Sequence, residues 1–133
     1  MSEREQDVSQ SVGSDVKSKR VFDLEERTAK FGEGVITLAK RLRKDDINQT
    51  LGVQAVRSAT SVGANYAEAD ATQTKKDFRH RIGICLRESK ETKHWLRMLA
   101  KANDAQKVEC RKLWQEAQEL SLIFSAIIRS SKQ

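Results

Sequence analysis

Residues 47–70, INQTLGVQAVRSATSVGANYAEAD, carry small and apolar side chains at helical spacing on two sides at once. One side is a seam made of Leu51, Ala55, Ser58, Val62 and Ala69, with Tyr66 beside it. The opposite side holds Val53, Val56, Thr60, Ala64 and Ala67. Polar side chains are confined to a strip of Gln54, Arg57, Ser61 and Glu68, with Asn65 at its edge. A helix of this kind is expected to be buried on both sides.

The rest of the chain predicts three more helices, each with one apolar seam. The helix over about residues 23–44 has the seam Leu24, Thr28, Phe31, Val35, Leu38 and Leu42. The helix that follows Thr74 and ends near Ala102 has the seam Phe78, Ile82, Cys85, Ser89, Thr92, Leu96 and Leu99. The helix over about residues 105–129 has the seam Cys110, Leu113, Ala117, Leu120, Phe124 and Ile127. Leu122 and Ala126 point away from that last seam.

Short polar segments separate the helices and offer caps. Asp45 and Asp46 can cap the helix after them, Thr74 with Asp77 resembles a capping box, and Asp104 is the expected N-cap of the last helix. The chain contains no proline, which favours long uninterrupted helices. The predicted fold class is therefore all-α, an up-down-up-down four-helix bundle over residues 21–130. Residues 1–20, rich in Ser, Gln and mixed charge, are predicted to be a disordered N-terminal tail.

The chain shows no signal for a membrane or for secretion. It has no apolar stretch of about 18 residues, and residues 1–20 lack the apolar block of a secretory signal. Cys85 and Cys110 lie on neighbouring seams, about 20 Å apart in an antiparallel hairpin, which is too far for a disulfide. Both are predicted to be reduced and buried, as is typical of a cytoplasmic protein.

Two sequence motifs resemble a known family. Residues 61–69, SVGANYAEA, resemble the signature of the bacterial four-helix-bundle proteins encoded in ribosomal-RNA intervening sequences. Residues 87–92, RESKET, followed by Trp95-Leu96 and Leu99, are similar to that family's third helix, and Phe22 and Leu24 fit the head of its first. The resemblance covers about residues 21–130. Ala69 departs from it, because the family more often has glycine there, which leaves the turn after this helix open.

The resemblance implies a homo-oligomer, typically a pentameric ring. It also implies a relation to the accessory variability protein of diversity-generating retroelements, whose members form basic pentamers that bind nucleic acid and a reverse transcriptase. On these grounds RNA is expected as a ligand rather than DNA, and a reverse transcriptase is the alternative partner. The predicted oligomer interface consists of small or apolar residues that would be partly exposed to solvent in a monomer. They are Val53, Val56, Ala64, Ala67, Leu122 and Ala126.

The helix over residues 75–102 holds the clearest charge asymmetry. Between Thr74 and Lys101 there are nine Lys or Arg residues and three acids, a net of +6 that equals the net charge of the whole chain. Eight basic residues fall in one line opposite the seam, and we call them the basic stripe: Lys76, Arg79, His80, Arg87, Lys90, His94, Arg97 and Lys101. Two interpretations remain open, an ordinary solvated helix face and a surface that follows the phosphates of a nucleic acid.

The remaining candidates favour structure over chemistry. His80 and His94 are about 21 Å apart along one helix and cannot share a metal, so no metal site and no cofactor are predicted. Ser61, Asn65 and Glu68 have no neighbouring base, so no catalytic site is predicted. They are predicted to belong to a buried polar strip with Arg57, Arg81 and Glu88, in which Arg57 lies level with Glu88 and Asn65 near Arg81. Gly32-Glu33-Gly34 lies within a helical heptad and is not a nucleotide loop.

Three functional hypotheses follow from these residues and the resemblance. The leading one is a non-enzymatic, oligomeric accessory protein that binds nucleic acid, RNA rather than DNA, through the basic stripe. The alternative is a structural or protein-interaction module, with a reverse transcriptase of a diversity-generating retroelement as the partner that the resemblance suggests. An enzyme ranks last, because no constellation of reactive side chains is visible.

Overall fold

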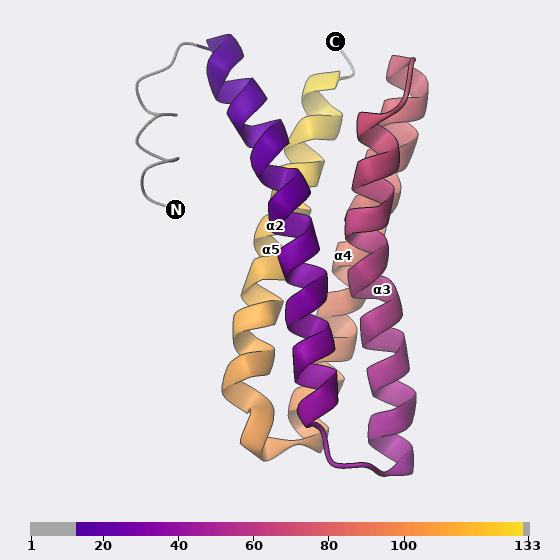
Figure 1. Ribbon diagram of the computed structural model, residues 1–133, viewed down its shortest axis with the longest axis vertical. Helices are drawn as coiled ribbons and strands as arrows, with labels where there is room; N and C mark the ends of the chain where they lie inside the picture. Colours follow the sequence, from indigo (N-terminus) through magenta and orange to yellow (C-terminus); the bar gives the residue numbers. More distant parts are fainter. Residues whose placement is uncertain (1–12, 132–133) are drawn as a thin grey trace.

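The computed structural model describes residues 13–131, and their side chains from Leu24 on. Four long helices run alternately up and down beside one another (Figure 1): α2 (Gly13–Arg41), α3 (Asp46–Asp70), α4 (Lys75–Ala102) and α5 (Lys107–Ser131). A single 3₁₀ turn, η1 (Asp104–Gln106), precedes α5. The described residues contain no strand, so the predicted all-α four-helix bundle is confirmed.

Each helix packs against the next one in the chain, and α2 also contacts α5. The helices therefore stand at the corners of a square, in which α2 lies diagonally across from α4. The start of α2 and the end of α5 lie at the same end of the bundle (Figure 1). This arrangement leaves one side of every helix facing outward.

The first helix begins earlier than predicted. Its start was expected near Asp23, where the apolar seam begins, but α2 starts at Gly13. Residues 13–20, assigned to the disordered tail, are therefore helical, and residues 1–12 of that tail lie outside the described residues. The apolar periodicity shows only where a helix contacts the core. No proline or glycine stands between Gly13 and Gly32 to end the helix, so it continues past the core.

The caps between helices agree with the prediction in two places and differ in one. Asp45 accepts a hydrogen bond from the backbone amide of Asn48 at 2.8 Å, and the Thr74 hydroxyl accepts one from the amide of Asp77 at 3.1 Å. Asp104 is not the N-cap of the last helix, because the 3₁₀ turn intervenes and α5 starts at Lys107.

A pair of amide side chains explains why the chain turns at residue 103. The Asn103 and Asn48 side chains exchange two hydrogen bonds of 2.8 and 2.9 Å. The same amide nitrogens also donate to the carbonyls of Leu99 and Arg43 at 3.0 and 2.8 Å. Asn48 is 5% exposed, so the pair binds the α2–α3 and α4–α5 connections together in a nearly dry environment.

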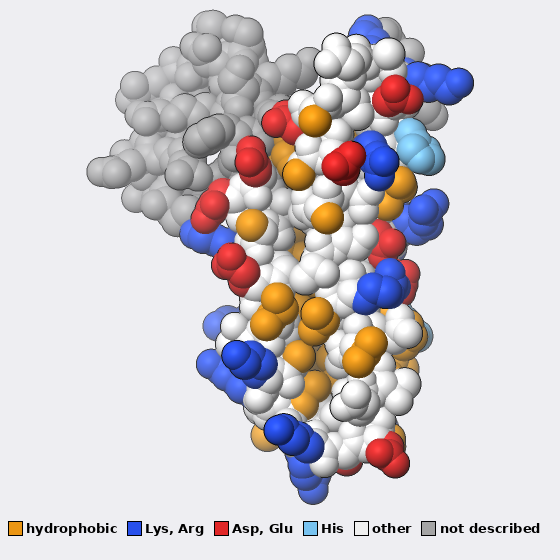
Figure 2. Space-filling view, turned by 45° about the vertical axis from the view of Figure 1, so that its right-hand side comes forward, with side chains coloured by type: hydrophobic (Ala, Val, Ile, Leu, Met, Phe, Trp, Pro, Cys, Tyr) orange, Lys and Arg blue, Asp and Glu red, His pale blue; other side chains and the backbone are white. Residues whose placement is uncertain are grey.

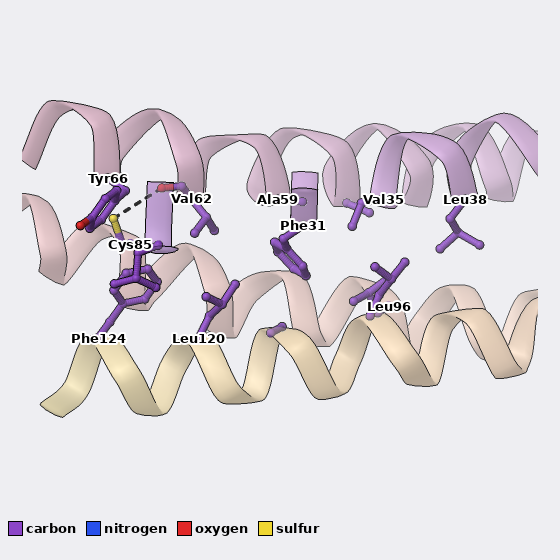
Figure 3. Packing of buried hydrophobic residues seen from close by; sticks show 14 of the residues in the cluster. Phe31, Val35, Leu38, Ala59, Val62, Tyr66, Cys85, Leu96, Leu120 and Phe124 are labelled. Carbon is purple, nitrogen blue, oxygen red and sulfur yellow. Dashed lines mark hydrogen bonds between the residues drawn. The ribbon is translucent and has the colours of Figure 1, made fainter. Parts of the chain in front are cut away.

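The four predicted seams meet in one core. Its fully buried members include Val35, Val62, Ile82, Leu96 and Leu120 (Figure 3). Between α3 and α4 the core contains small polar residues. The hydroxyls of Thr92 and Ser58 are fully buried and lie 2.8 Å apart. Beside Val62, Tyr66 stacks obliquely on Phe124 with ring centroids 6.4 Å apart.

Two glycines lie in the contact between α2 and α3. A Cβ atom at Gly63 would lie 3.5 Å from the backbone oxygen of Thr28, and one at Gly32 would lie 3.5 Å from the Cα of Thr60. The first glycine of the Gly32-Glu33-Gly34 sequence thus serves helix packing within α2. Gly63, inside the SVGANYAEA segment, does the same from the other helix.

Both cysteines are free and buried, as predicted. The Cys85 thiol donates to the backbone oxygen of Val62 at 3.5 Å, and burial raises its pKa to about 12 (Figure 3). Burial raises the pKa of Cys110 to about 11. Neither thiol is therefore a reactive thiolate near neutral pH.

Candidate nucleic-acid interface

The basic stripe runs along the outward side of α4. Seven of its eight side chains are exposed, and Arg79 is half-buried because its Nη1 donates to the backbone oxygen of Ser131 at 3.1 Å. From Lys76 to Lys101 the stripe extends about 38 Å at helical rise. From Arg87 on, basic groups recur every three or four residues, and a gap of seven residues separates Arg87 from His80. All eight groups lie on one side of the helix, in a nearly straight row.

Among the described residues, no carboxylate lies within ion-pair distance of any stripe side chain. Two of the three acids in this stretch of α4, Glu88 and Glu91, are turned toward α3, where both bind Arg57. The indole of Trp95 also donates to Glu91 at 2.9 Å. The stripe therefore presents uncompensated positive charge to solvent, which attracts polyanions.

The polar strip forms two separate clusters between α3 and α4. In the first, Arg57 Nη1 lies 3.5 Å from Glu88 Oε1, and Nη2 makes a shorter contact with Glu91. The hydrogen bond from Trp95 and the contact with Arg57 hold the pKa of Glu91 below its usual range. Glu91 was not part of the predicted strip, although it lies one helical turn beyond Glu88 and within reach of an arginine.

The second cluster joins the SVGANYAEA segment to α4. Asn65 donates to the backbone oxygen and hydroxyl of Ser61 at 2.9 and 3.0 Å, and its oxygen accepts from Arg81 Nη1 at 3.0 Å. Arg81 Nη2 lies 4.0 Å from Glu68 Oε1. The strip was expected to be buried, and this was wrong. The side chains of Arg57 and Arg81 are 48% and 38% exposed, because the long guanidinium arms reach the helix–helix contact from outside.

A third cluster was missed by sequence analysis. Arg27 on α2 forms two hydrogen bonds of 2.7 and 2.9 Å with Glu116 on α5, and a third of 2.7 Å with Glu119. The bond to Glu116 raises the pKa of Arg27. Arg27 directly precedes the seam residue Thr28, and Glu116 directly precedes the seam residue Ala117. A search for opposite charges beside two seams could therefore have found this cluster.

The two tryptophans pack on the flanks of α4 and α5. Trp95 is fixed by its bond to Glu91, and its ring meets the His94 ring at a centroid distance of 4.9 Å. Lys93 Nζ lies 5.1 Å from the centroid of the Trp114 ring and 2.6 Å from the Gln118 side-chain oxygen. Both indoles are partly buried against the core, which leaves the stripe without an aromatic stacking platform.

The outward side of α3 is exposed, so this helix is buried on only one side within a single chain. Val53 is 56% exposed, Ala64 and Ala67 are exposed, and Val56 is half-buried. On α5, Leu122 is 59% exposed and Ala126 is also exposed. Figure 2 shows the side of the molecule with α3, where hydrophobic side chains lie along the middle and Lys and Arg side chains gather at the lower left.

An open groove lies beside this apolar face. It encloses about 950 Å³ between the end of α2 and the start of α3. Leu42, Gly52 and Val53 are among the residues that line it, and Lys40, Arg43 and Lys44 stand at its border. The groove and the exposed apolar residues of α3 thus form one continuous outward surface of the described chain.

The other candidate features of the described part of the chain are metal clusters and membrane spans. His80 and His94 both stand exposed on the stripe, and no group of three or more His, Cys, Asp or Glu side chains between residues 13 and 131 could hold a metal ion. The Ser61 hydroxyl accepts from Asn65, with neither histidine nor cysteine in contact. No helix in this range is both long and apolar enough to cross a membrane.

Comparisons with known proteins agree with this architecture. The family model described as 23S rRNA-intervening sequence protein matches residues 22–126. A crystal structure of a protein of unknown function from the S23 ribosomal protein family of Bacteroides thetaiotaomicron superposes with a TM-score of 0.70. It is 26% identical, and the match covers 78% of this chain and 96% of that one. No curated protein matches.

Proposed function

This chain belongs to the 23S rRNA-intervening sequence protein family, and we propose that it is a non-enzymatic, self-associating accessory protein that holds RNA along the basic stripe of α4. The family name refers to intervening sequences of 23S rRNA, which supports RNA rather than DNA as the ligand. The stripe offers charge but no set of side chains arranged to read base edges. Binding is therefore expected to follow the sugar–phosphate backbone with little sequence preference.

The observation that carries this proposal is the unpaired state of the stripe. Arg27, Arg57 and Arg81 each have a carboxylate partner within 4.0 Å, but the eight residues of the stripe have none among the described residues. An ordinary solvated helix face gains by mixing opposite charges at neighbouring turns. Here Glu88 and Glu91, two of the three acids between Lys76 and Lys101, bind Arg57 on α3, which leaves a row of cations suited to displacing counterions from phosphates.

Lysine footprinting tests where RNA lies. The protein is acetylated with a lysine-selective reagent in the presence and absence of a short unstructured RNA, and each lysine is quantified by mass spectrometry. Lys76, Lys90 and Lys101 should be protected by RNA, whereas Lys40 and Lys44 on the diagonal side should react equally in both samples. Protection of Lys40 and Lys44 alone, or of no lysine at all, would refute the stripe as the binding surface.

We further propose that copies of the chain associate through the outward sides of α3 and α5. Val53 on α3 and Leu122 on α5 are more than half exposed, and two different patches are what a ring-forming contact joins. A pentamer is the assembly favoured by family resemblance. A ring would repeat the stripe in every protomer and multiply weak phosphate contacts.

Light scattering coupled to gel filtration measures this association. Wild type should have the mass of an oligomer at tens of micromolar, about the range in which modest interfaces assemble. Leu122→Glu should shift it to the monomer mass, because a charge would be buried in the contact. The matched change Ala29→Glu, at an exposed site on α2, should leave the mass unchanged. A monomeric wild type would end the proposal of self-association.

The exposed apolar side of α3 also favours a second candidate function. The protein would then be an interaction module for another protein, with a reverse transcriptase of a diversity-generating retroelement as the partner that the family resemblance suggests. The groove bordered by Lys40, Arg43 and Lys44 supports such a contact, because it combines an apolar lining with charge. Absence of RNA and DNA binding even at low salt would favour this candidate over the first.

A further inference from the structure

Gly83 interrupts the basic stripe in the first third of α4, between His80 and Arg87. A Cβ atom built at this position would have no neighbouring atom within 4 Å. The position is thus open to solvent, and it forms a gap in a row of otherwise long basic side chains.

Nothing within the chain accounts for a glycine here. Glycine is, after proline, the least favourable residue in a helix interior. Gly32 and Gly63 lie in the contact between α2 and α3, where a larger side chain would be crowded, but Gly83 has no described neighbour within 4 Å of its Cβ position. Its backbone is also ordinary, because no described glycine has a positive φ. Alanine would fit at position 83 and would stabilise the helix.

We propose that Gly83 forms a notch in which the sugar–phosphate backbone of bound RNA lies directly against α4, between the side chains of Arg79 and His80 on one flank and Arg87 on the other. This inference rests on the proposed function. The amides of a helix interior are already hydrogen-bonded, so the glycine itself contributes only space. That space lets a phosphate lie closer to the flanking basic groups, and the attraction between charges grows as their distance shrinks.

The inference predicts that stability and binding change in opposite directions. Gly83→Ala and Gly83→Gln should raise the melting temperature by about 2–6 °C, because both residues favour a helix more than glycine. Gly83→Gln should weaken RNA binding by about fivefold or more, and Gly83→Ala by less, because the notch is filled. Both variants keep the charge of the protein, so a loss of affinity would be steric. A residue with a purely structural role would not lower RNA affinity while raising stability.

Fluorescence anisotropy with a labelled single-stranded RNA and thermal melting by circular dichroism measure both quantities. Ala29→Gln is the matched control, since it enlarges an exposed side chain on α2, diagonally across the bundle. It should bind RNA as wild type does. Light scattering is run on each variant as a check on assembly.

Three outcomes would overturn the inference, and they are distinguishable. If wild type binds RNA and Gly83→Gln binds it equally well, the inferred role of the notch is wrong and the proposed function still stands. A changed oligomer mass together with lost binding would place Gly83 at a contact between copies instead. A wild type that binds no RNA would remove the proposed function and the notch together.

Discussion

Replacing Gly63 by leucine should destabilise the bundle by about 3 kcal/mol or more, because forcing a larger side chain into a filled space displaces the elements around it. A Cβ at this position would already be in van der Waals contact with the backbone of Thr28, at 3.5 Å. A methyl group therefore fits, and Gly63→Ala should be tolerated. The branched end of leucine has nowhere to go unless α2 moves away from α3.

Urea denaturation followed by circular dichroism measures this effect, at one protein concentration because self-association also contributes to stability. Gly83→Leu is the matched control, because it makes the same substitution where no atom lies within 4 Å of the added Cβ. It should be as stable as wild type or more so. Equal losses for the two variants would show that α2 and α3 do not cross closely at Gly63.

The helical seams could be predicted from the sequence because burial imposes a period on apolar side chains. Residues such as Leu38, Val62, Ile82 and Leu120 face the core as their spacing indicates. The start of α2 could not be predicted in this way, because residues before Leu24 lack that period. The close approach at Gly63 also left no sequence signal, since a glycine in a helix does not show which helix it faces.

The position of the basic stripe was evident from sequence, but its electrostatic state was not. Helical spacing places Lys90 and Arg97 on one line, yet it does not show whether an acid from a neighbouring helix reaches them. The missing information was the direction of Glu88 and Glu91, which only the packing of α4 against α3 supplies. Comparing the heights of residues along α3 and α4 identified Glu88 as a partner of Arg57. It missed Glu91, because the long arginine side chain reaches across a full helical turn.

The residue pattern on α3 predicted more burial than a single chain provides. Small and apolar residues on both of its sides predicted burial on both, whereas Val53 is 56% exposed here. A sequence is selected in its functional assembly, so periodicity records contacts with partners as well as contacts within the chain. For the same reason the pattern could not show whether this side of α3 meets a second copy, another protein or only solvent.

The most direct measurement of RNA binding by α4 compares two triple variants that each remove three positive charges. The first changes Arg87, Lys90 and Arg97 on the stripe to Gln; Arg79 is spared because it bonds to Ser131. The second changes Lys40 on α2 and Arg43 and Lys44 in the connection to α3 to Gln; all three line the groove. Both variants should fold, because all six side chains are exposed and have no ion-pair partner among residues 24–131.

Affinity is measured by fluorescence anisotropy over a salt series from about 50 to 200 mM, the range in which phosphate contacts dominate. The stripe variant should bind RNA about 10- to 100-fold more weakly than wild type. Its slope of log affinity against log salt should be shallower by about 2, since each lost contact with a single strand contributes about 0.7. The groove variant should keep a slope near that of wild type and lose little affinity. Equal losses in the two variants would contradict a binding site on α4, because they would show that only the net charge of the protein matters.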